Sequence, residues 1–162
     1  MQKEDPAEHD GSRLRYFYRG WRPTLYGRMW TRIYAWLAGF GLLPKILVCL
    51  QTKDRGSGRQ VAHVLVPVAF EGERYLVSML GEQSNWVRDI RATNGTAFLK
   101  RGRKYAIRLV EIPPSHRAPI LKAWCEIATS GRRHIPVSFD ASLTAFEPIA
   151  GDYPVFRIDP AA

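Results

Sequence analysis

The sequence predicts a mainly β fold with added helices (α+β), in which a largely antiparallel sheet curls into a barrel. Hydrophobic and β-branched residues follow a strand-like pattern from Lys45 onward. Helical segments fall between these strands, but they do not alternate with them in the β-α-β-α order of a parallel sheet. The 162 residues, of which 46% are hydrophobic, are enough for one domain with a buried core, which we assign to residues 44–162.

Six segments have the composition and periodicity of strands. Pro67 lacks an amide hydrogen, so it places the longest segment at a sheet edge or at a bulge. Alternation in the last segment puts Phe156 and Ile158 on one face and Arg157 on the other. The chain turns at residues 101–103 to form a hairpin. The predicted strands span residues 46–52, 61–70, 74–80, 96–100, 105–112 and 155–158.

Two helices are predicted between the strands. Ser84 is suited to cap the first, which runs through Ala92 and ends at Asn94-Gly95. Ser115 is suited to cap the second, and Pro119 is tolerated in its first turn because the amides there lack helical partners. The predicted buried face of the second helix comprises Ile120, Leu121, Trp124 and Ile127.

The first 43 residues differ from the rest in composition. Residues 1–12 are polar and are predicted to form a loose tail. Residues 13–43 carry six arginines, nine aromatic residues and no acidic residue, and their periodicity predicts a basic amphipathic helix over residues 24–38. Its uncharged run, residues 33–43, is about half of the roughly 20 residues that span a bilayer. The helix is expected either to pack on the barrel, which we favour slightly, or to lie on an anionic membrane.

Charge, cysteines and histidines narrow the class of protein. The formal net charge of +9 favours an anionic partner, which we expect to be a small-molecule cofactor or a membrane surface, with no specific nucleic acid. Cys49 and Cys125 stand in apolar stretches and are predicted to be reduced core thiols.

Nothing near the start resembles a secretory signal, so we expect a cytoplasmic protein, at most peripheral at the inner face of the membrane. The histidines lack metal-ligand spacing, and His63, beside the expected pocket, is taken as a half-buried, hydrogen-bonded residue in preference to a proton donor.

Three short motifs have the residue types of a binding site. The turn Asp54-Arg55-Gly56-Ser57-Gly58-Arg59 lies between two predicted strands. Its glycines, hydroxyl and arginines suit either a phosphate nest or an ordinary solvated turn. The predicted strand 74–80 is followed by Gly81, where the backbone can approach a flat ligand. Residues 85–91 then form a helix in which Trp86 is favoured as a core aromatic.

In this order, and followed by a hairpin and a helix that starts near Pro113-Pro114, the motifs resemble the deazaflavin (F420)-dependent nitroreductases, or F420H2-dependent quinone reductases. The resemblance runs from about residue 39 to residue 158 and is most specific over residues 55–92. It implies a split β-barrel of the FMN-binding type with coenzyme F420 as the cofactor. It also implies hydride transfer from the reduced deazaflavin to a nitro compound, a quinone or another electron-poor acceptor.

The resemblance also implies, by position, which residues contact the cofactor. It assigns no catalytic side chain, because the cofactor carries the chemistry. The implied contacts are Arg55, Ser57 and Gly58 at the phosphate-bearing side chain, Ser78, Met79, Leu80 and Gly81 at the ring edge, and Trp86, Val87 and Arg88 on the flanking helix.

The turn departs from the family pattern, which reads Gly-Arg-(Arg/Lys)-Ser-Gly-x-x-Arg-Thr-x-Pro. Asp54 replaces the glycine, Gly56 the second basic residue, Val61 the later arginine and Val64 the proline. At least two positive charges near the phosphate are therefore missing. Two alternatives follow: an FMN-dependent flavin oxidoreductase, or a non-catalytic basic protein with a decayed cofactor site that binds membrane or nucleic acid. Pairing through the sheets, which the resemblance also implies, predicts a homodimer.

Overall fold

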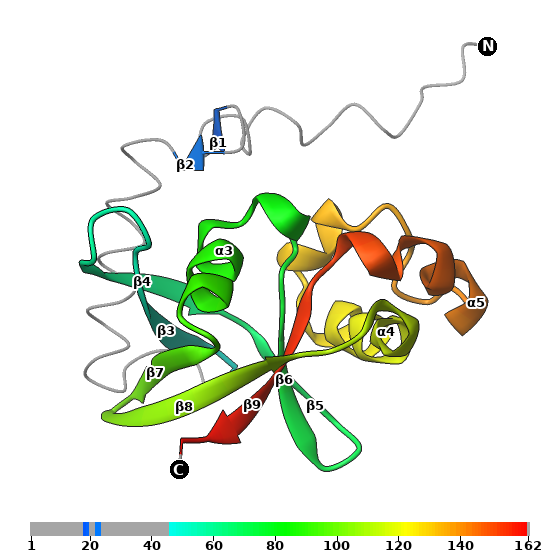
Figure 1. Cartoon of the computed structure of the whole chain (residues 1–162). Coiled ribbons are helices and arrows are strands. Elements are labelled where there is room, and N and C mark those ends of the chain that lie inside the picture. Colours follow the sequence, from blue (N-terminus) through cyan, green and yellow to red (C-terminus); the bar gives the residue numbers. More distant parts are fainter. Residues whose placement is uncertain (1–17, 20–21, 24–45, 162) are drawn as a thin grey trace, which may run out of the picture.

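The computed structural model describes residues 18–19, 22–23 and 46–161 (Figure 1). The predicted tail 1–12 and the predicted helix 24–38 lie outside these residues. Two short strands, β1 (Tyr18–Arg19) and β2 (Arg22–Pro23), pair antiparallel with each other. The main body of the fold comes from residues 46–161.

One seven-stranded antiparallel sheet forms this body. Its strands lie in the order β4-β3-β7-β8-β9-β6-β5. The sheet curls into a half-barrel (Figure 1), and this confirms the predicted α+β class. The strands are β3 (Val48–Lys53), β4 (Gln60–Leu65), β5 (Pro67–Phe70), β6 (Glu73–Val77), β7 (Thr96–Arg101), β8 (Arg103–Glu111) and β9 (Val155–Pro160).

The prediction of one continuous strand over residues 61–70 was wrong. The run forms two strands, β4 and β5, which lie at opposite edges of the sheet. Pro67 begins β5 and is accommodated at an edge, as its missing amide hydrogen requires. Val66 lies between the two strands, and its carbonyl accepts a hydrogen bond of 2.9 Å from Nε1 of Trp124. A single residue, Val66, therefore connects the two edge strands of the half-barrel, and the hydrogen bond from Trp124 holds it in place.

The two helices predicted between the strands are present, but their caps differ from the prediction, and the structure adds a short helix at residues 143–146 that the sequence analysis did not predict. Ser84 occupies the N-cap position of the first helix, yet its hydroxyl bonds that of Ser78 at 2.6 Å. His116, not Ser115, is the N-cap residue of the second. In both cases a 3₁₀ turn immediately precedes the helix, and the serine hydroxyl makes no capping hydrogen bond to the helix backbone. The helices are α3 (Asn85–Ala92), α4 (Arg117–Ile127) and α5 (Leu143–Phe146), with 3₁₀ turns η1 (Gly81–Gln83), η2 (Pro114–His116), η3 (Gly131–His134) and η4 (Glu147–Asp152).

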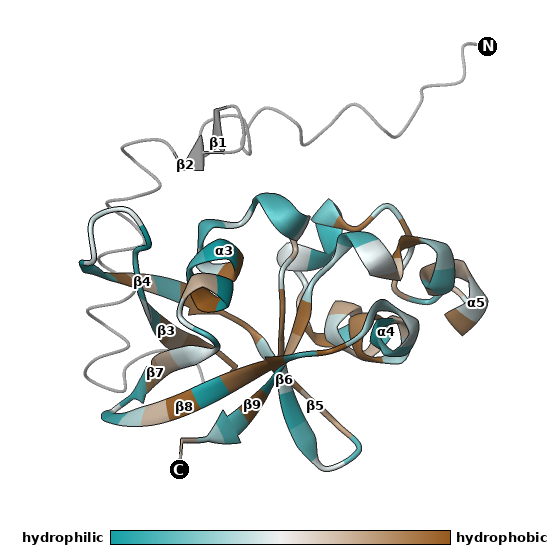
Figure 2. Ribbon diagram, in the orientation of Figure 1, coloured by the Kyte–Doolittle hydropathy of each residue, from teal (hydrophilic) through white to brown (hydrophobic). Residues whose placement is uncertain are grey.

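Strands β6 and β9 are covered on both faces, because the helices pack on the two sides of the sheet. Leu76 and Phe156 join one cluster with the apolar face of α3. Val77 and Val155 join the other with α4 and α5. Figure 2 shows the hydrophobic sides of α3 and α4 turned toward these strands. The end of β6 is therefore anchored between two layers, and this fixes the position of the residues that follow it.

Both cysteines are buried, and Cys125 belongs to the cluster that packs against α4 and α5. Cys49 and Cys125 are both free thiols with 1% and 0% of their surface exposed, which confirms the predicted reduced core thiols. Burial raises the pKa of the Cys125 thiol to about 11, so this thiol stays protonated at neutral pH. In the part of the chain that the structure describes, no helix has the length and apolar character that crossing a bilayer requires.

Candidate functional site

The three predicted motifs meet around α3. The turn between β3 and β4 reaches the middle of this helix, because the amide and the guanidinium of Arg55 both donate to Oδ1 of Asp89, at 3.2 and 2.9 Å. The end of β6 reaches the start of the same helix through the bond between the hydroxyls of Ser78 and Ser84. The three motifs, which follow one another in the sequence, are therefore also neighbours in the structure.

The segment Ser78–Gly81 after β6 is tightly fixed. The amide of Ser78 donates to the carbonyl of Pro154 at 2.9 Å, and its buried hydroxyl donates to the carbonyl of Gly81 at 2.8 Å. Gly81 has φ +64°, and a Cβ built on it would lie 2.7 Å from the carbonyl oxygen of Asp152. A side chain does not fit there without a backbone shift. Glycine therefore lets this segment pack directly against the end of η4.

A cavity of about 220 Å³ opens at this point, and we call it the strand-end pocket. Three of the predicted cofactor contacts line it. The residues contributed by η3, by η4 and by the position after η4 were not predicted, since no local pattern links them to β6. The lining residues are Met79, Leu80, Gly81, His134, Asp152 and Tyr153.

The unpredicted wall of the strand-end pocket carries its titratable groups. The hydroxyl of Tyr153 donates to the carbonyl of His134 at 3.1 Å, which ties η4 to η3. Burial lowers the pKa of His134 and raises that of Tyr153. Both side chains are therefore neutral at physiological pH. The neutral imidazole of His134 has one donor and one acceptor nitrogen for a ligand in the pocket.

The predicted contacts on α3 occupy different environments. Trp86 and Val87 belong to the core, with 5% and 0% of their surface exposed, and the Trp86 ring packs edge-on against Phe156 with 5.3 Å between centroids. This confirms Trp86 as a core aromatic. Arg88 is exposed, and its guanidinium donates to Oε1 of Gln83 at 2.6 Å. The role of these residues as cofactor contacts stays a prediction.

The predicted phosphate contacts lie apart from the strand-end pocket. Arg55, Ser57 and Gly58 are exposed residues of the turn between β3 and β4, and none of them lines the pocket. Hydrogen bonds from Ser57 lower the pKa of the Asp54 carboxyl within the same turn. The structure thus brings the two groups of predicted contacts to the same helix, but not into one cavity.

His63 lies on β4 next to this region and is half-buried. Its Nε2 is 3.2 Å from the hydroxyl of Thr52 on β3, which confirms the expected hydrogen-bonded histidine. Burial lowers the pKa of His63 to about 4, although the negative charge of Asp89 acts in the opposite direction. The neutral imidazole is therefore the form that the fold accommodates.

This environment predicts a loss of stability in mild acid. The unfolded chain binds a proton at His63 below about pH 6.5, whereas the folded chain resists it down to about pH 4, so stability falls as the pH drops through this window. Between pH 7 and pH 5 we expect His63 to remove about 2 kcal/mol from the free energy of unfolding. Urea unfolding at pH 7 and at pH 5 measures this loss. Between these two pH values, His63→Gln should lose less stability than the wild type, whereas the exposed control His116→Gln should lose as much as the wild type.

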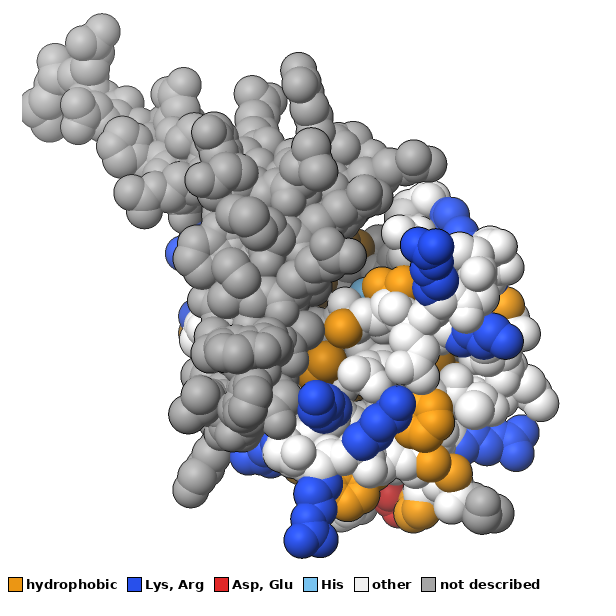
Figure 3. All heavy atoms as spheres, turned by 90° about the vertical axis from the view of Figure 1, so that its left-hand side faces the viewer, with side chains coloured by type: hydrophobic (Ala, Val, Ile, Leu, Met, Phe, Trp, Pro, Cys, Tyr) orange, Lys and Arg blue, Asp and Glu red, His pale blue; other side chains and the backbone are white. Residues whose placement is uncertain are grey.

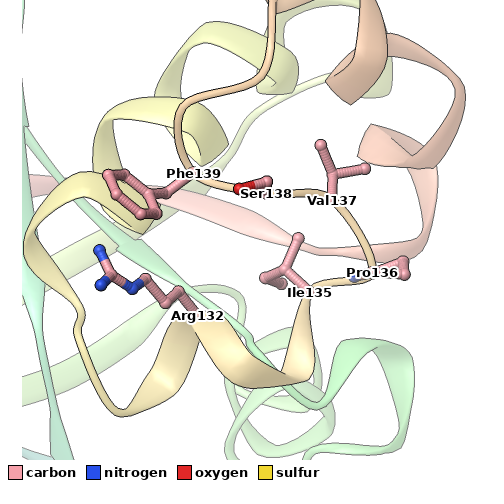
Figure 4. A pocket seen from close by; sticks show the side chains of 6 residues that line it. All are labelled: Arg132, Ile135, Pro136, Val137, Ser138 and Phe139. Atoms are coloured by element: carbon pink, nitrogen blue, oxygen red, sulfur yellow. The ribbon is translucent and has the colours of Figure 1, made fainter. Parts of the chain in front are cut away.

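A second cavity of about 370 Å³ is larger but unrelated to the predicted motifs. Figure 4 shows that its side chains come from one segment, residues 132–139, in which the Arg132 guanidinium lies over the Phe139 ring at 3.9 Å from the centroid. One continuous segment forms this whole cavity, and none of the predicted site residues lines it. We therefore take the strand-end pocket as the candidate site. Within the described residues, no three His, Cys, Asp or Glu side chains gather closely enough to hold a metal ion.

Comparison with known proteins gives similarity in structure only. No family model and no curated protein matches the chain. The chain is similar to a solved domain-swapped dimer, with a TM-score of 0.53 and 16% identity over 83% of this chain and 97% of that one. It is also similar to the Agrobacterium tumefaciens protein Atu2129, of unknown function, with a TM-score of 0.54 and 11% identity over 81% of this chain.

The chain spans about half of Atu2129, since the match covers 55% of that protein. An F420-H2 dependent reductase, FDR-A, matches with a TM-score of 0.45 and 20% identity, over 72% of this chain and 96% of that one. At such identities the likeness to the domain-swapped dimer and to Atu2129 shows the fold alone. That fold is the α+β split barrel of the FMN-binding-like type, as predicted.

Proposed function

We propose that this chain is an oxidoreductase that binds a flavin-type ring in the strand-end pocket and transfers a hydride from reduced coenzyme F420 to an electron-poor acceptor. One observation carries the proposal. The family resemblance implies a ring edge at Ser78, Met79, Leu80 and Gly81, and the last three of these residues line a cavity just after the end of β6. A pocket at the predicted position, on a fold of this class, supports the proposal more directly than net charge does.

The residues present fit one end of a planar ring. Met79 and Leu80 provide apolar surface, and Gly81 leaves the backbone open to close approach. His134 and Tyr153 add polar groups that are neutral at physiological pH. The volume of about 220 Å³ is below the roughly 300–1,000 Å³ of typical ligand pockets. The pocket therefore suits part of a tricyclic ring, with the rest of the cofactor outside it.

The bound cofactor would supply the hydride, and the chain would supply position and electrostatics. The Ser78 hydroxyl, bonded to Gly81 and Ser84, holds the segment that contacts the ring in one conformation. The apolar side chains of Met79 and Leu80 exclude water from one side of the pocket. A neutral His134 imidazole is able to donate a hydrogen bond to negative charge that develops on the acceptor.

Ligand titration tests the proposal. Purified protein is titrated with F420, FMN and NADPH and followed by fluorescence, and then F420H2 oxidation is measured with a quinone or a nitro compound. We expect F420 to bind and NADPH not to bind. Leu80→Trp should fill the pocket and weaken F420 binding by at least about tenfold. Leu143→Trp, at an exposed position on α5, should leave binding unchanged.

Two results would contradict the proposal. The first is tight NADPH binding without any response to a deazaflavin or a flavin. The second is wild-type affinity in Leu80→Trp, which would remove the ring from the strand-end pocket. Binding of FMN with no response to F420 would keep the pocket but favour the FMN-dependent alternative.

A basic surface favours a second candidate, a non-catalytic protein that binds an anionic membrane. Figure 3 shows Lys and Arg side chains around apolar ones on the side of the molecule that carries β3, β4 and the β7–β8 hairpin. Exposed basic residues of these strands and their turns are Lys53, Arg59, Arg101, Arg103 and Lys104. This candidate predicts a colourless protein that sediments with anionic vesicles at low salt and less at high salt. Equal partitioning with neutral vesicles would contradict it.

A further inference from the structure

The turn between β3 and β4 contains its own anion. Oδ1 of Asp54 accepts hydrogen bonds from the amide and the hydroxyl of Ser57, both at 2.6 Å. The Gly56 amide also contributes to lowering the pKa of this carboxyl. The Gly58 amide donates to the backbone carbonyl of Asp54 at 2.8 Å. The donors that would form a phosphate nest therefore point at oxygen atoms of Asp54, those of Ser57 at its carboxylate and that of Gly58 at its backbone carbonyl.

The cation of the turn has an internal partner too. The guanidinium of Arg55 pairs with Asp89, whose side chain is only 2% exposed, at 2.9 Å. If Arg55 left this pair, the negative charge of the buried Asp89 carboxylate would have no cation beside it, and an unpaired buried charge lowers the stability of the fold. The Arg55 amide donates to the same oxygen at 3.2 Å. Arg55 is consequently committed to α3, and a phosphate at the turn would have to compete with Asp89 for it.

These contacts do not fit a phosphate group at the turn. A phosphate there would meet the negative charge of Asp54, and it would have to displace this carboxylate to reach Ser57. We propose that Asp54 is a specificity-determining residue, which excludes phosphate from the turn, so that a flavin-type ligand, F420 included, binds in the strand-end pocket without its phosphate at Ser57. The inference rests on the proposed function for the ring, but the contacts at the turn stand by themselves.

Riboflavin and FMN are the direct probes, because they share one ring system and differ by a phosphate. Wild-type protein should bind both with similar affinity. Asp54→Ala removes the internal acceptor and should tighten FMN binding by about tenfold, the effect of one charge-assisted hydrogen bond, with riboflavin unchanged. Asp54→Asn removes the charge but keeps an acceptor, so it should have a smaller effect in the same direction.

Asp140→Asn is the matched control. Asp140 is exposed, and its carboxylate also accepts a hydrogen bond from the hydroxyl of a nearby serine, Ser138, so the substitution removes the same charge from a comparable side chain outside the turn. This variant should not alter the ratio of FMN to riboflavin affinity. Thermal melts of all variants check that each one is folded at the temperature of the titration.

A second measurement does not depend on ring binding. Inorganic phosphate is titrated into ¹⁵N-labelled protein, and the amide signals of Gly56, Ser57 and Gly58 are followed. They should shift with phosphate in Asp54→Ala but not in the wild type. Wild-type protein that responds at these amides, or that prefers FMN to riboflavin more than about tenfold, would overturn the role of Asp54. Loss of binding of every ring, with the phosphate results as expected, would overturn only the proposed function.

Discussion

Arg117→Ala is expected to lower the free energy of unfolding by about 3 kcal/mol, although Arg117 lies outside the candidate pocket. Its side chain is only 5% exposed and makes contacts in three directions. Nε donates to the carbonyl of Ile112 at 2.7 Å, Nη1 to that of Gly151 at 3.2 Å, and Nη2 to Oε1 of Glu111 at 2.9 Å. Alanine would leave these acceptors without their donor, and such groups cost most when they are shielded from water.

The effect should exceed that of a surface arginine because Arg117 joins three elements. It links the end of β8 and the start of α4 to η4, which forms part of the strand-end pocket. Glu111 keeps its second partner, Arg91, at 2.6 Å, so the loss stays below that of a fully stranded charge. Urea unfolding measures the change, and Arg117→Lys should recover part of it, since lysine restores the charge but not the fork of donors.

Arg157→Ala is the control for removing an arginine from an ion pair. Arg157 pairs with Asp159 at 2.7 Å on β9, and its side chain is 39% exposed. Exposed pairs of this kind contribute little to stability, because solvent screens the attraction. Equal destabilisation by Arg117→Ala and Arg157→Ala would mean that the buried contacts of Arg117 do not hold η4 to the sheet.

The local course of the chain was predictable, because strand alternation and turn residues are local signals. The hairpin around residues 101–103 and the last strand both formed as predicted, with Phe156 and Ile158 buried and Arg157 half-exposed. The division of residues 61–70 was not predictable in the same way. β4 and β5 belong to opposite edges because of what each strand pairs with far along the chain, and a run of β-branched residues does not encode its partners.

The candidate site was predictable in part, for a related reason. The predicted strand 74–80 was too long, since β6 ends at Val77, but the close backbone approach expected at Gly81 is present. His134, Asp152 and Tyr153 come from two 3₁₀ turns and a loop position with no motif, so only the fold brings them to Met79. The turn at Asp54 was visible as a departure from the family pattern. Which donors its carboxylate captures depends on geometry that residue types do not specify.

Gly81→Ala is expected to lower the free energy of unfolding by about 2–5 kcal/mol and to weaken ring binding at the strand-end pocket. Two costs add in this substitution. The left-handed backbone at φ +64° disfavours any side chain by about 1–2 kcal/mol. The new Cβ would also lie 2.7 Å from the carbonyl oxygen of Asp152, so one of the two backbone segments has to move, and overpacking of this kind costs about 1–3 kcal/mol.

Gly72→Ala separates the two costs. Gly72 has φ +82° in the turn between β5 and β6, and a Cβ there would meet nothing within 4 Å, so this variant bears the backbone cost alone. Urea unfolding should show Gly81→Ala to be the more destabilised of the two. Flavin and deazaflavin titrations, made where both variants are folded, should show at least about a tenfold loss of affinity in Gly81→Ala only. Gly81 and Asp152 both line the pocket, so a Cβ between them must displace one wall of it. If both variants lost equal stability and neither lost affinity, the contact between Gly81 and Asp152 would have no part in shaping the pocket.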